Sequence, residues 1–320
     1  SMNKIIRVIC LAVLMLGGSA AWAGPFEEGV AAYGRGDYVS AVKIFRPLAA
    51  QGYAPALFKL GVLYERGQGV KQDNTEAVKW YRLSAAQRYA PAQSNLGVMY
   101  VNGKGLKQDY AEAVKWYRLA AAQGNAEAQF DLGVLYGNGQ GVKQDYAEAV
   151  KWYRLSAAQG YVSAQVNLGL MYQIGHRVRQ DYAEAIKWYR LSAAQGNAEA
   201  QVNLGVMYAK GQGVTADYAE AVKWYRLSAA QGHARAQFNL GAMYSNGQGV
   251  KQDYAEAVKW YRSSAAQGYA SAQTNLGARY VNGQSVVQDY VRAHMWFSLA
   301  AVSADSDADA VKNRDRGGPV

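Results

Sequence analysis

Apolar positions recur along the chain with the three- and four-residue steps of amphipathic α-helices, and polar positions fill the spaces between them. Residues 125–160 are typical: Ala128, Leu132 and Tyr136 fall on one face of a first expected helix. The glycines of the Gly-Asn-Gly-Gln-Gly stretch at residues 137–141 interrupt this pattern and predict a loop. The first helix, which we term helix A, is therefore expected to end at Tyr136.

A second helix, helix B, is expected after this loop. Asp145 is a favourable N-cap residue and Glu148 follows three residues later, which is a variant of the capping box. The buried face of helix B is expected to carry Tyr146, Ala149, Trp152, Tyr153 and Ser156. Glu148, Lys151 and Arg154 lie on the opposite face, which is expected to contact solvent. Gly160 stands where a left-handed residue ends a helix, so the block predicts a helical hairpin.

The hairpin recurs every 36 residues. Tryptophans mark the period at Trp80, Trp116, Trp152, Trp188, Trp224, Trp260 and Trp296. Aspartates keep the same step, at Asp73, Asp109, Asp145, Asp181, Asp217, Asp253 and Asp289. We therefore predict seven stacked repeats in residues 53–304, namely 53–88, 89–124, 125–160, 161–196, 197–232, 233–268 and 269–304. Residues 24–52 form a leading half-repeat, because residues 41–46 align with residues 77–82.

Residues 1–23 are expected to be a secretory signal peptide, with Ser1 as an added residue. Lys4 and Arg7 give a positive start, residues 8–16 are apolar, and an Ala-Trp-Ala cleavage signal follows. The apolar run is too short to span a bilayer, which takes about 20 residues; a retained interfacial anchor is the alternative. We expect an exported protein, periplasmic or secreted, that is not transmembrane after cleavage.

Composition restricts the chemistry further. The single cysteine lies in the expected signal peptide, and the three histidines have no metal-ligand spacing, so neither a metal nor a cofactor is expected. The net charge is +10, or +8 without Lys4 and Arg7. The negative charges of Glu148 and its equivalents partly neutralise the positive charges of Lys151 and its equivalents. On this solvent-facing side of helix B, no aromatic residues alternate with the basic ones as stacking platforms for bases would require. We expect no nucleic-acid partner, while weak attraction to anionic lipid or polysaccharide stays open.

The motifs of each repeat resemble those of the Sel-1-like repeat family, relatives of the tetratricopeptide repeats. The third repeat matches the family pattern at Ala128, Leu132, Gly133, Tyr136, Gly139, Gly141, Val142, Asp145, Tyr146, Ala149, Trp152 and Tyr153. The 36-residue period and the glycine-rich loop differ from the 34-residue tetratricopeptide repeat. The resemblance implies an all-α, right-handed superhelical solenoid with the A helices on its concave side. It also implies an interaction scaffold, often in the bacterial envelope.

Positions that change between repeats gather on one stripe of helix A, opposite its core face. The seventh position of each repeat reads Lys59, Asn95, Asp131, Asn167, Asn203, Asn239 and Asn275. Carboxamides donate and accept at once, so this column could bind the backbone of an extended peptide; alternatively, it bonds to the neighbouring repeat. The sixth position, with Phe130 and Phe238, offers apolar contacts or belongs to the core between repeats. The candidate partner-binding residues are Asn95, Asp131, Asn167, Asn203, Asn239, Asn275, Phe130 and Phe238.

The seventh repeat departs from the others. Ser285 replaces the second glycine of the loop, and Met295 replaces the solvent-facing lysine that precedes the tryptophan in the other repeats. Phe297 stands where other repeats have tyrosine. Residues 305–320 are a short polar tail that resembles the start of a capping segment in the family. We expect either that the cap of this edge is incomplete or that a second chain covers Met295 and Phe297.

One string is typical of an enzyme. Ser40-Ala41-Val42-Lys43 has the S-x-x-K form of penicillin-recognising enzymes, and Tyr100-Val101-Asn102 imitates a second element, but no K-T-G follows. Ser40 also occupies the register of Glu76 in an ordinary helix B. The leading hypothesis is a non-enzymatic scaffold that binds a protein or peptide. The alternatives are a weak β-lactam-binding enzyme and a structural component of an envelope polysaccharide or signalling complex.

Overall fold

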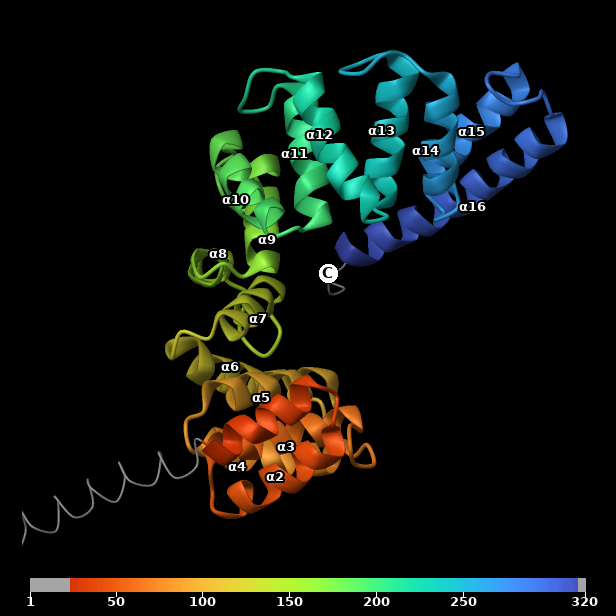
Figure 1. The fold of residues 1–320 in the computed structure, drawn as a ribbon. Coiled ribbons are helices and arrows are strands. Elements are labelled where there is room, and N and C mark those ends of the chain that lie inside the picture. Colours follow the sequence, from red (N-terminus) through yellow and green to blue (C-terminus); the bar gives the residue numbers. More distant parts are fainter. Residues whose placement is uncertain (1–23, 316–320) are drawn as a thin grey trace, which may run out of the picture. The chain divides into compact units, whose positions relative to one another are not determined.

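The computed structural model describes the backbone of residues 24–315 and the side chains of residues 24–304, so the expected signal peptide lies outside the described residues. Helices follow one another in chain order, and no strand occurs within residues 24–315 (Figure 1). A helical segment at residues 24–34 precedes α2 (Tyr38–Ala50), α3 (Ala54–Arg66), α4 (Asn74–Ala86), α5 (Ala90–Asn102), α6 (Tyr110–Ala122), α7 (Ala126–Asn138), α8 (Tyr146–Ala158), α9 (Val162–Ile174), α10 (Tyr182–Ala194), α11 (Ala198–Lys210), α12 (Tyr218–Ala230), α13 (Ala234–Asn246), α14 (Tyr254–Ala265), α15 (Ala270–Asn282) and α16 (Tyr290–Asp315).

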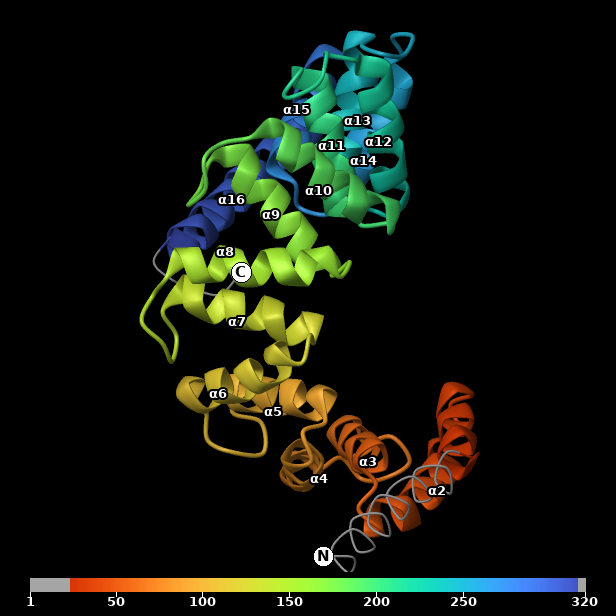
Figure 2. The same ribbon diagram turned by 90° about the vertical axis from the view of Figure 1, so that its left-hand side faces the viewer.

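Two compact units divide the chain, an N-terminal unit of residues 1–152 and a C-terminal unit of residues 153–320. In the N-terminal unit, α3 packs against α4 and α5 against α6. In the C-terminal unit the hairpins are α9–α10, α11–α12, α13–α14 and α15–α16 (Figure 2). Within each unit, a helix B also packs against the helix A that follows it, as α4 does against α5 and α12 against α13. The predicted solenoid of helix-loop-helix repeats is confirmed.

Each helix B starts at its aspartate, as predicted. The Asp73 carboxylate accepts a hydrogen bond from the backbone N–H of Glu76 at 2.9 Å. The reciprocal half of the predicted capping box does not form, because the backbone N–H of Asp73 already donates to the Tyr64 carbonyl at 3.0 Å. The Glu76 carboxylate instead contacts the Lys79 ammonium at 2.7 Å, on the exposed face of the helix.

Helix A packs so closely on helix B that one position of helix A has room only for glycine. A Cβ added to Gly97 in α5 would lie 2.5 Å from the ring of Tyr117 in α6. Gly61 and Gly169 stand in the same relation to Tyr81 and Tyr189. The Leu-Gly pair of the repeat motif is thus explained: the leucine fills the core, and the glycine lets the tyrosine ring lie against the helix backbone.

The loop between helices A and B fixes the distance between successive repeats. Gly69 has φ +71°, and a Cβ there would lie 2.5 Å from the carbonyl oxygen of Tyr38, at the start of the preceding helix B. Three residues other than glycine also have positive φ: Arg88 (63°), Arg177 (62°) and Ser285 (56°). All three occupy columns that hold glycine in most other repeats. The left-handed backbone conformation of these positions is therefore retained even where another residue replaces glycine.

The two ends of the repeat array differ. At the start, the expected half-repeat supplies α2, whose buried Phe45 and Leu48 share a core with Leu60 of α3. At the end, α16 continues to Asp315, so the first part of the expected polar tail extends the last helix. Ser285 has a left-handed backbone in the loop before it.

Candidate functional site

The seventh position of helix A lies at the border between repeats. The Asn95 amide on α5 donates to the Tyr81 hydroxyl on α4, the helix B of the preceding repeat, at 3.1 Å. Asp131 on α7 has the same relation to Tyr117 on α6, whose hydroxyl is hydrogen-bonded to its carboxylate. At Asn95 and Asp131, the side chain at this position therefore joins its repeat to the one before it.

Other members of the column are engaged in different ways. Asn203 is buried, and its carbonyl oxygen accepts from the Arg235 guanidinium of the next repeat. Asn275 is hydrogen-bonded to Tyr261, as Asn95 is to Tyr81. Asn167 and Asn239 are half-buried. Side-chain bonds between neighbouring repeats, one of the two roles considered for this column, are thus present at Asn95, Asp131, Asn203 and Asn275.

The apolar candidates also lie at repeat borders. The Phe238 ring has its centroid 5.8 Å from that of Tyr261 and 5.3 Å from that of Tyr269, in the following repeat. Phe58 makes the equivalent pairs with Tyr81 and Tyr89. Phe130 is half-buried in the same column. The aromatic residues of the sixth column thus contribute to the packing within and between repeats, and Phe130 and Phe238 stay half-buried.

The pKa of Asp131 is raised to about 7, firstly by burial and secondly by the charge of Glu127, one turn earlier on α7. The Tyr117 hydroxyl opposes this rise by donating a hydrogen bond. Asp131 is the acidic member of a column that is otherwise mostly asparagine. Its carboxyl group is therefore partly protonated near neutral pH.

A charged cluster joins α11 to α13 on the helix-A side of the C-terminal unit. The Glu199 carboxylate contacts His233 Nε2 at 2.8 Å and the Arg235 guanidinium at 3.5 Å. His233 is also the N-cap of α13, where its Nδ1 accepts from the backbone N–H of Ala236 at 3.4 Å. The hydrogen bond from His233 is the main cause that lowers the pKa of Glu199. This role of His233 was not identified from the sequence, although Asn125 and Asn197, the N-caps in the same column of the repeat, indicate it.

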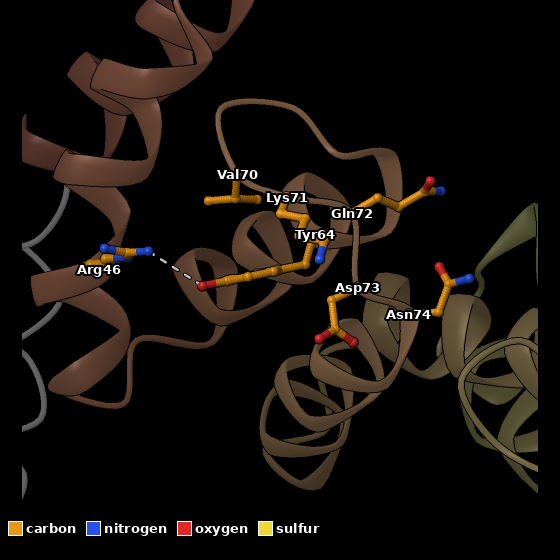
Figure 3. Close-up of a pocket in the computed structure, with 7 residues that line it drawn as sticks. All are labelled: Arg46, Tyr64, Val70, Lys71, Gln72, Asp73 and Asn74. Atoms are coloured by element: carbon orange, nitrogen blue, oxygen red, sulfur yellow. Dashed lines mark hydrogen bonds between the residues drawn. The ribbon is translucent and has the colours of Figure 1, made fainter.

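Bonds from arginine on a helix B to tyrosine on the following helix A form a second regular series. The Arg46 guanidinium donates to the Tyr64 hydroxyl, 18 residues later, at 3.3 Å (Figure 3). Equivalent bonds join Arg82 to Tyr100, Arg118 to Tyr136, Arg154 to Tyr172, Arg190 to Tyr208, Arg226 to Tyr244 and Arg262 to Tyr280. A cavity of about 730 Å³ lies beside the first pair and one of about 600 Å³ beside Arg154. Because these cavities recur with the repeat, they are features of the architecture rather than of one binding site.

Residues singled out for other chemistry lie apart from these sites. Ser40 sits in the first turn of α2, where its backbone N–H donates to the Asp37 carboxylate at 3.1 Å. The Tyr100 hydroxyl accepts from Arg82 instead of approaching Ser40. No group of three or more histidine, cysteine, aspartate or glutamate side chains suited to a metal occurs in the part of the chain that the structure describes. In that same part, no helix combines the length and apolar character needed to cross a bilayer.

The edge of the seventh repeat is exposed. Met295 and Phe297 on α16 keep 45% and 39% of their surface accessible, and Tyr290, Val291 and Val302 on the same helix are exposed as well. The inner part of the Phe297 ring packs on Gly277, in the place that tyrosine takes in earlier repeats.

Comparison with known proteins gives concordant results. A family model described as the Sel1 repeat matches residues 54–89, 90–125, 126–161, 162–197, 198–233, 234–269 and 270–301, each beginning one residue after the boundary expected from the sequence. A protective antigen present in uropathogenic Escherichia coli strains, which displays an SLR fold, is 38% identical with a TM-score of 0.81, over 96% of this chain and 68% of that one. A Sel1 repeat protein from Oxalobacter formigenes is 32% identical with a TM-score of 0.68, over 76% of this chain and 96% of that one. A search of curated proteins finds no match.

Proposed function

The chain belongs to the Sel1 repeat family, and we propose that it is a non-enzymatic, exported scaffold that binds a protein or peptide on its helix-A face. Sel1 repeats in general mediate protein–protein interactions. The A helices are expected to form the concave side of the solenoid. The proposal contains no catalytic step, because Ser40 is an ordinary helix-start residue in a register that other repeats fill with glutamate.

The contrast between the two faces supports this proposal. The helix-B face carries the same exposed Glu–Lys pair in six repeats, at Glu76–Lys79, Glu112–Lys115, Glu148–Lys151, Glu184–Lys187, Glu220–Lys223 and Glu256–Lys259. The helix-A stripe carries charges that differ from repeat to repeat, at Lys59, Glu65, Arg66, Glu127, Asp131, Glu199, Lys210 and Arg235. A uniform face offers a partner the same contacts everywhere, whereas a varied face can select one partner and one register.

The test is an affinity pull-down from envelope extract with the mature protein as bait. One variant carries Asn167→Ala, Asn203→Ala and Asn239→Ala on the helix-A face. The matched control carries Lys115→Gln and Lys223→Gln on the helix-B face. A partner that the control retains and the triple variant loses, with unchanged helix content by circular dichroism, supports the proposal. A partner that only the helix-B variant loses would refute it.

Export and self-association are parts of the same proposal. The signal-peptide pattern of residues 1–23 supports export, and mass spectrometry of the exported protein is expected to find Gly24 as the first residue. The exposed Met295 and Phe297 support association of α16 with a second copy of the chain. An intact leader on the exported protein would contradict the first expectation.

A further inference from the structure

A cavity of about 370 Å³ opens on the helix-A stripe of the C-terminal unit. Ala209 and Lys210 of α11, Tyr225 of α12, Arg235 and Asn239 of α13, and Tyr269 ahead of α15 line it. Its lining comes from two successive A helices, the helix B between them and the first residue of the next repeat. Ala209, Lys210 and Arg235 stand at positions that vary between repeats, so the chemistry of the cavity belongs to this place in the chain.

Tyr225 lines the cavity, and its hydroxyl lacks a protein partner while the rest of the side chain is buried. Tyr225 is 2% exposed, and within the described residues its hydroxyl makes no hydrogen bond. In sister repeats the equivalent hydroxyls donate to Glu65 at 2.6 Å, from Tyr81, and to Gln173 at 2.9 Å, from Tyr189. The residue that corresponds to Glu65 and Gln173 is Ala209, whose methyl group cannot accept a hydrogen bond. The Tyr225 hydroxyl is therefore free to donate a hydrogen bond to a ligand in the cavity.

The other polar groups of the cavity are donors. Among the described side chains, the Lys210 ammonium and the Asn239 amide make no hydrogen bond or ion pair. The Arg235 guanidinium is held in place by Glu199 at 3.5 Å and by Asn203. Glu199 also accepts a hydrogen bond from His233 Nε2, and none of the residues that line the cavity is acidic.

Burial raises the pKa of Tyr225 to about 12, so its hydroxyl keeps its proton at neutral pH and remains a donor. The cavity thus presents the exposed Lys210 ammonium, the Arg235 guanidinium that Glu199 holds in place, and two neutral donors, with Val206, Ala209 and Tyr269 as an apolar wall. Anionic oxygens satisfy such a set, and hydrogen bonds to a charged acceptor are stronger than neutral ones.

We propose that this cavity binds the carboxylate of an acidic side chain carried by an extended peptide. The Tyr225 hydroxyl and the Asn239 amide donate to the carboxylate, Lys210 and Arg235 supply the opposite charge, and the methylene groups of the ligand lie against Tyr269. The inference rests on the proposed function, because it assigns the partner's chemistry at one point of the helix-A face.

The test measures fluorescence anisotropy of a labelled peptide of alternating Glu and Ser, with the Gln-Ser peptide as its neutral counterpart. The wild-type chain is expected to bind the acidic peptide at least about tenfold more tightly, and less tightly as salt is added. Tyr225→Phe should weaken binding about tenfold, since it removes one hydrogen bond to a charged group. Tyr189→Phe is the matched control: it makes the same change where the hydroxyl already has a partner, so peptide affinity should not change.

Ala209→Gln is the sharpest variant. The new glutamine would accept a hydrogen bond from Tyr225, as Gln173 does from Tyr189 in a sister repeat. It should therefore fill the cavity and leave the fold intact. We expect loss of peptide binding and an unchanged or higher melting temperature. Equal affinity for the acidic and neutral peptides, or full binding by Ala209→Gln, would overturn the proposal.

Two further results separate the possibilities. Polygalacturonate offers carboxylates on a polysaccharide; if it binds through Tyr225 and the peptide does not, the occupant is not a peptide and the proposal is wrong. If the pull-down partner is lost by the helix-A triple variant but retained by Ala209→Gln, the scaffold function stands and the cavity assignment fails. If the acidic peptide binds through the cavity but no partner depends on the helix-A asparagines, the cavity stands and the wider scaffold proposal fails.

Discussion

Asp131→Asn is expected to stabilise the N-terminal unit at neutral and alkaline pH and to have little effect in acid. Burial and the charge of Glu127 raise the pKa of Asp131 from 3.8 to about 7. Between these two values the unfolded chain has released the proton while the folded chain still holds it. Stability therefore falls as pH rises from about 4 to about 7, and the full penalty persists at higher pH.

The magnitude follows from that difference. Each pKa unit corresponds to about 1.36 kcal/mol, so the rise from 3.8 to about 7 is equivalent to roughly 4 kcal/mol as an upper limit. Asp131 keeps some contact with solvent, and relaxation lowers the penalty, so we expect about 1–2 kcal/mol to be recovered. Asparagine fits the site, because the Asn95 amide already donates to the Tyr81 hydroxyl in the equivalent place.

The assay is urea unfolding followed by circular dichroism at about pH 8 and about pH 4, with hydrogen exchange of the α6 and α7 amides as a local readout. Asn95→Asp is the matched control, since it introduces the carboxylate in the sister repeat; it should destabilise the chain at the higher pH and recover in acid. A gain from Asp131→Asn that is equal at both pH values would refute the reasoning, because it would show that the proton is not involved.

Three further predictions concern the backbone and the edge. Gly69→Ala and Gly52→Ala both place a side chain at positive φ, but of the two only Gly69 lies against the backbone of the preceding repeat. We expect the free energy of unfolding, measured in urea, to fall by about 3 kcal/mol for Gly69→Ala and by about 1 kcal/mol for Gly52→Ala. Equal losses would contradict the close approach at Gly69. Arg88→Gly relieves a left-handed arginine and should gain about 1 kcal/mol by the same measurement, whereas a loss would show that the arginine side chain stabilises the turn. The double variant Met295→Glu, Phe297→Tyr should shift any dimer to monomer in light scattering, and an unchanged mass would place self-association elsewhere.

The repeat register determined most of the fold in advance. The tryptophan and aspartate columns predicted each hairpin, and each helix B begins directly after its aspartate. The close contact of Gly97 with Tyr117 could not be read from one repeat, because it depends on how two helices approach. An alignment of the seven repeats nevertheless indicates it, because this position is glycine in every repeat.

The candidate site was harder to predict for a physical reason. From the sequence, Asn95 could bind either a partner or the neighbouring repeat, and its donation to Tyr81 depends on the side chain of another helix. Tyr225 stands in a column of tyrosines, so its own position does not distinguish it. Its hydroxyl is left open to the cavity because Ala209 stands where other repeats have Glu65 and Gln173.

The bonds between repeats join arginine to tyrosine at a constant sequence offset of 18, as from Arg46 to Tyr64. Within a repeat, the Ser84 hydroxyl donates to the Ala54 carbonyl, 30 residues earlier. Loss or duplication of a whole 36-residue block within either unit therefore keeps the bonds within repeats and recreates the arginine–tyrosine bond at the new junction. Loss of one residue more or fewer would displace all of them together. The number of repeats can therefore change in a single genetic event while every intermediate sequence still encodes a folded chain. The length of the binding face can evolve separately from the side chains that the face carries.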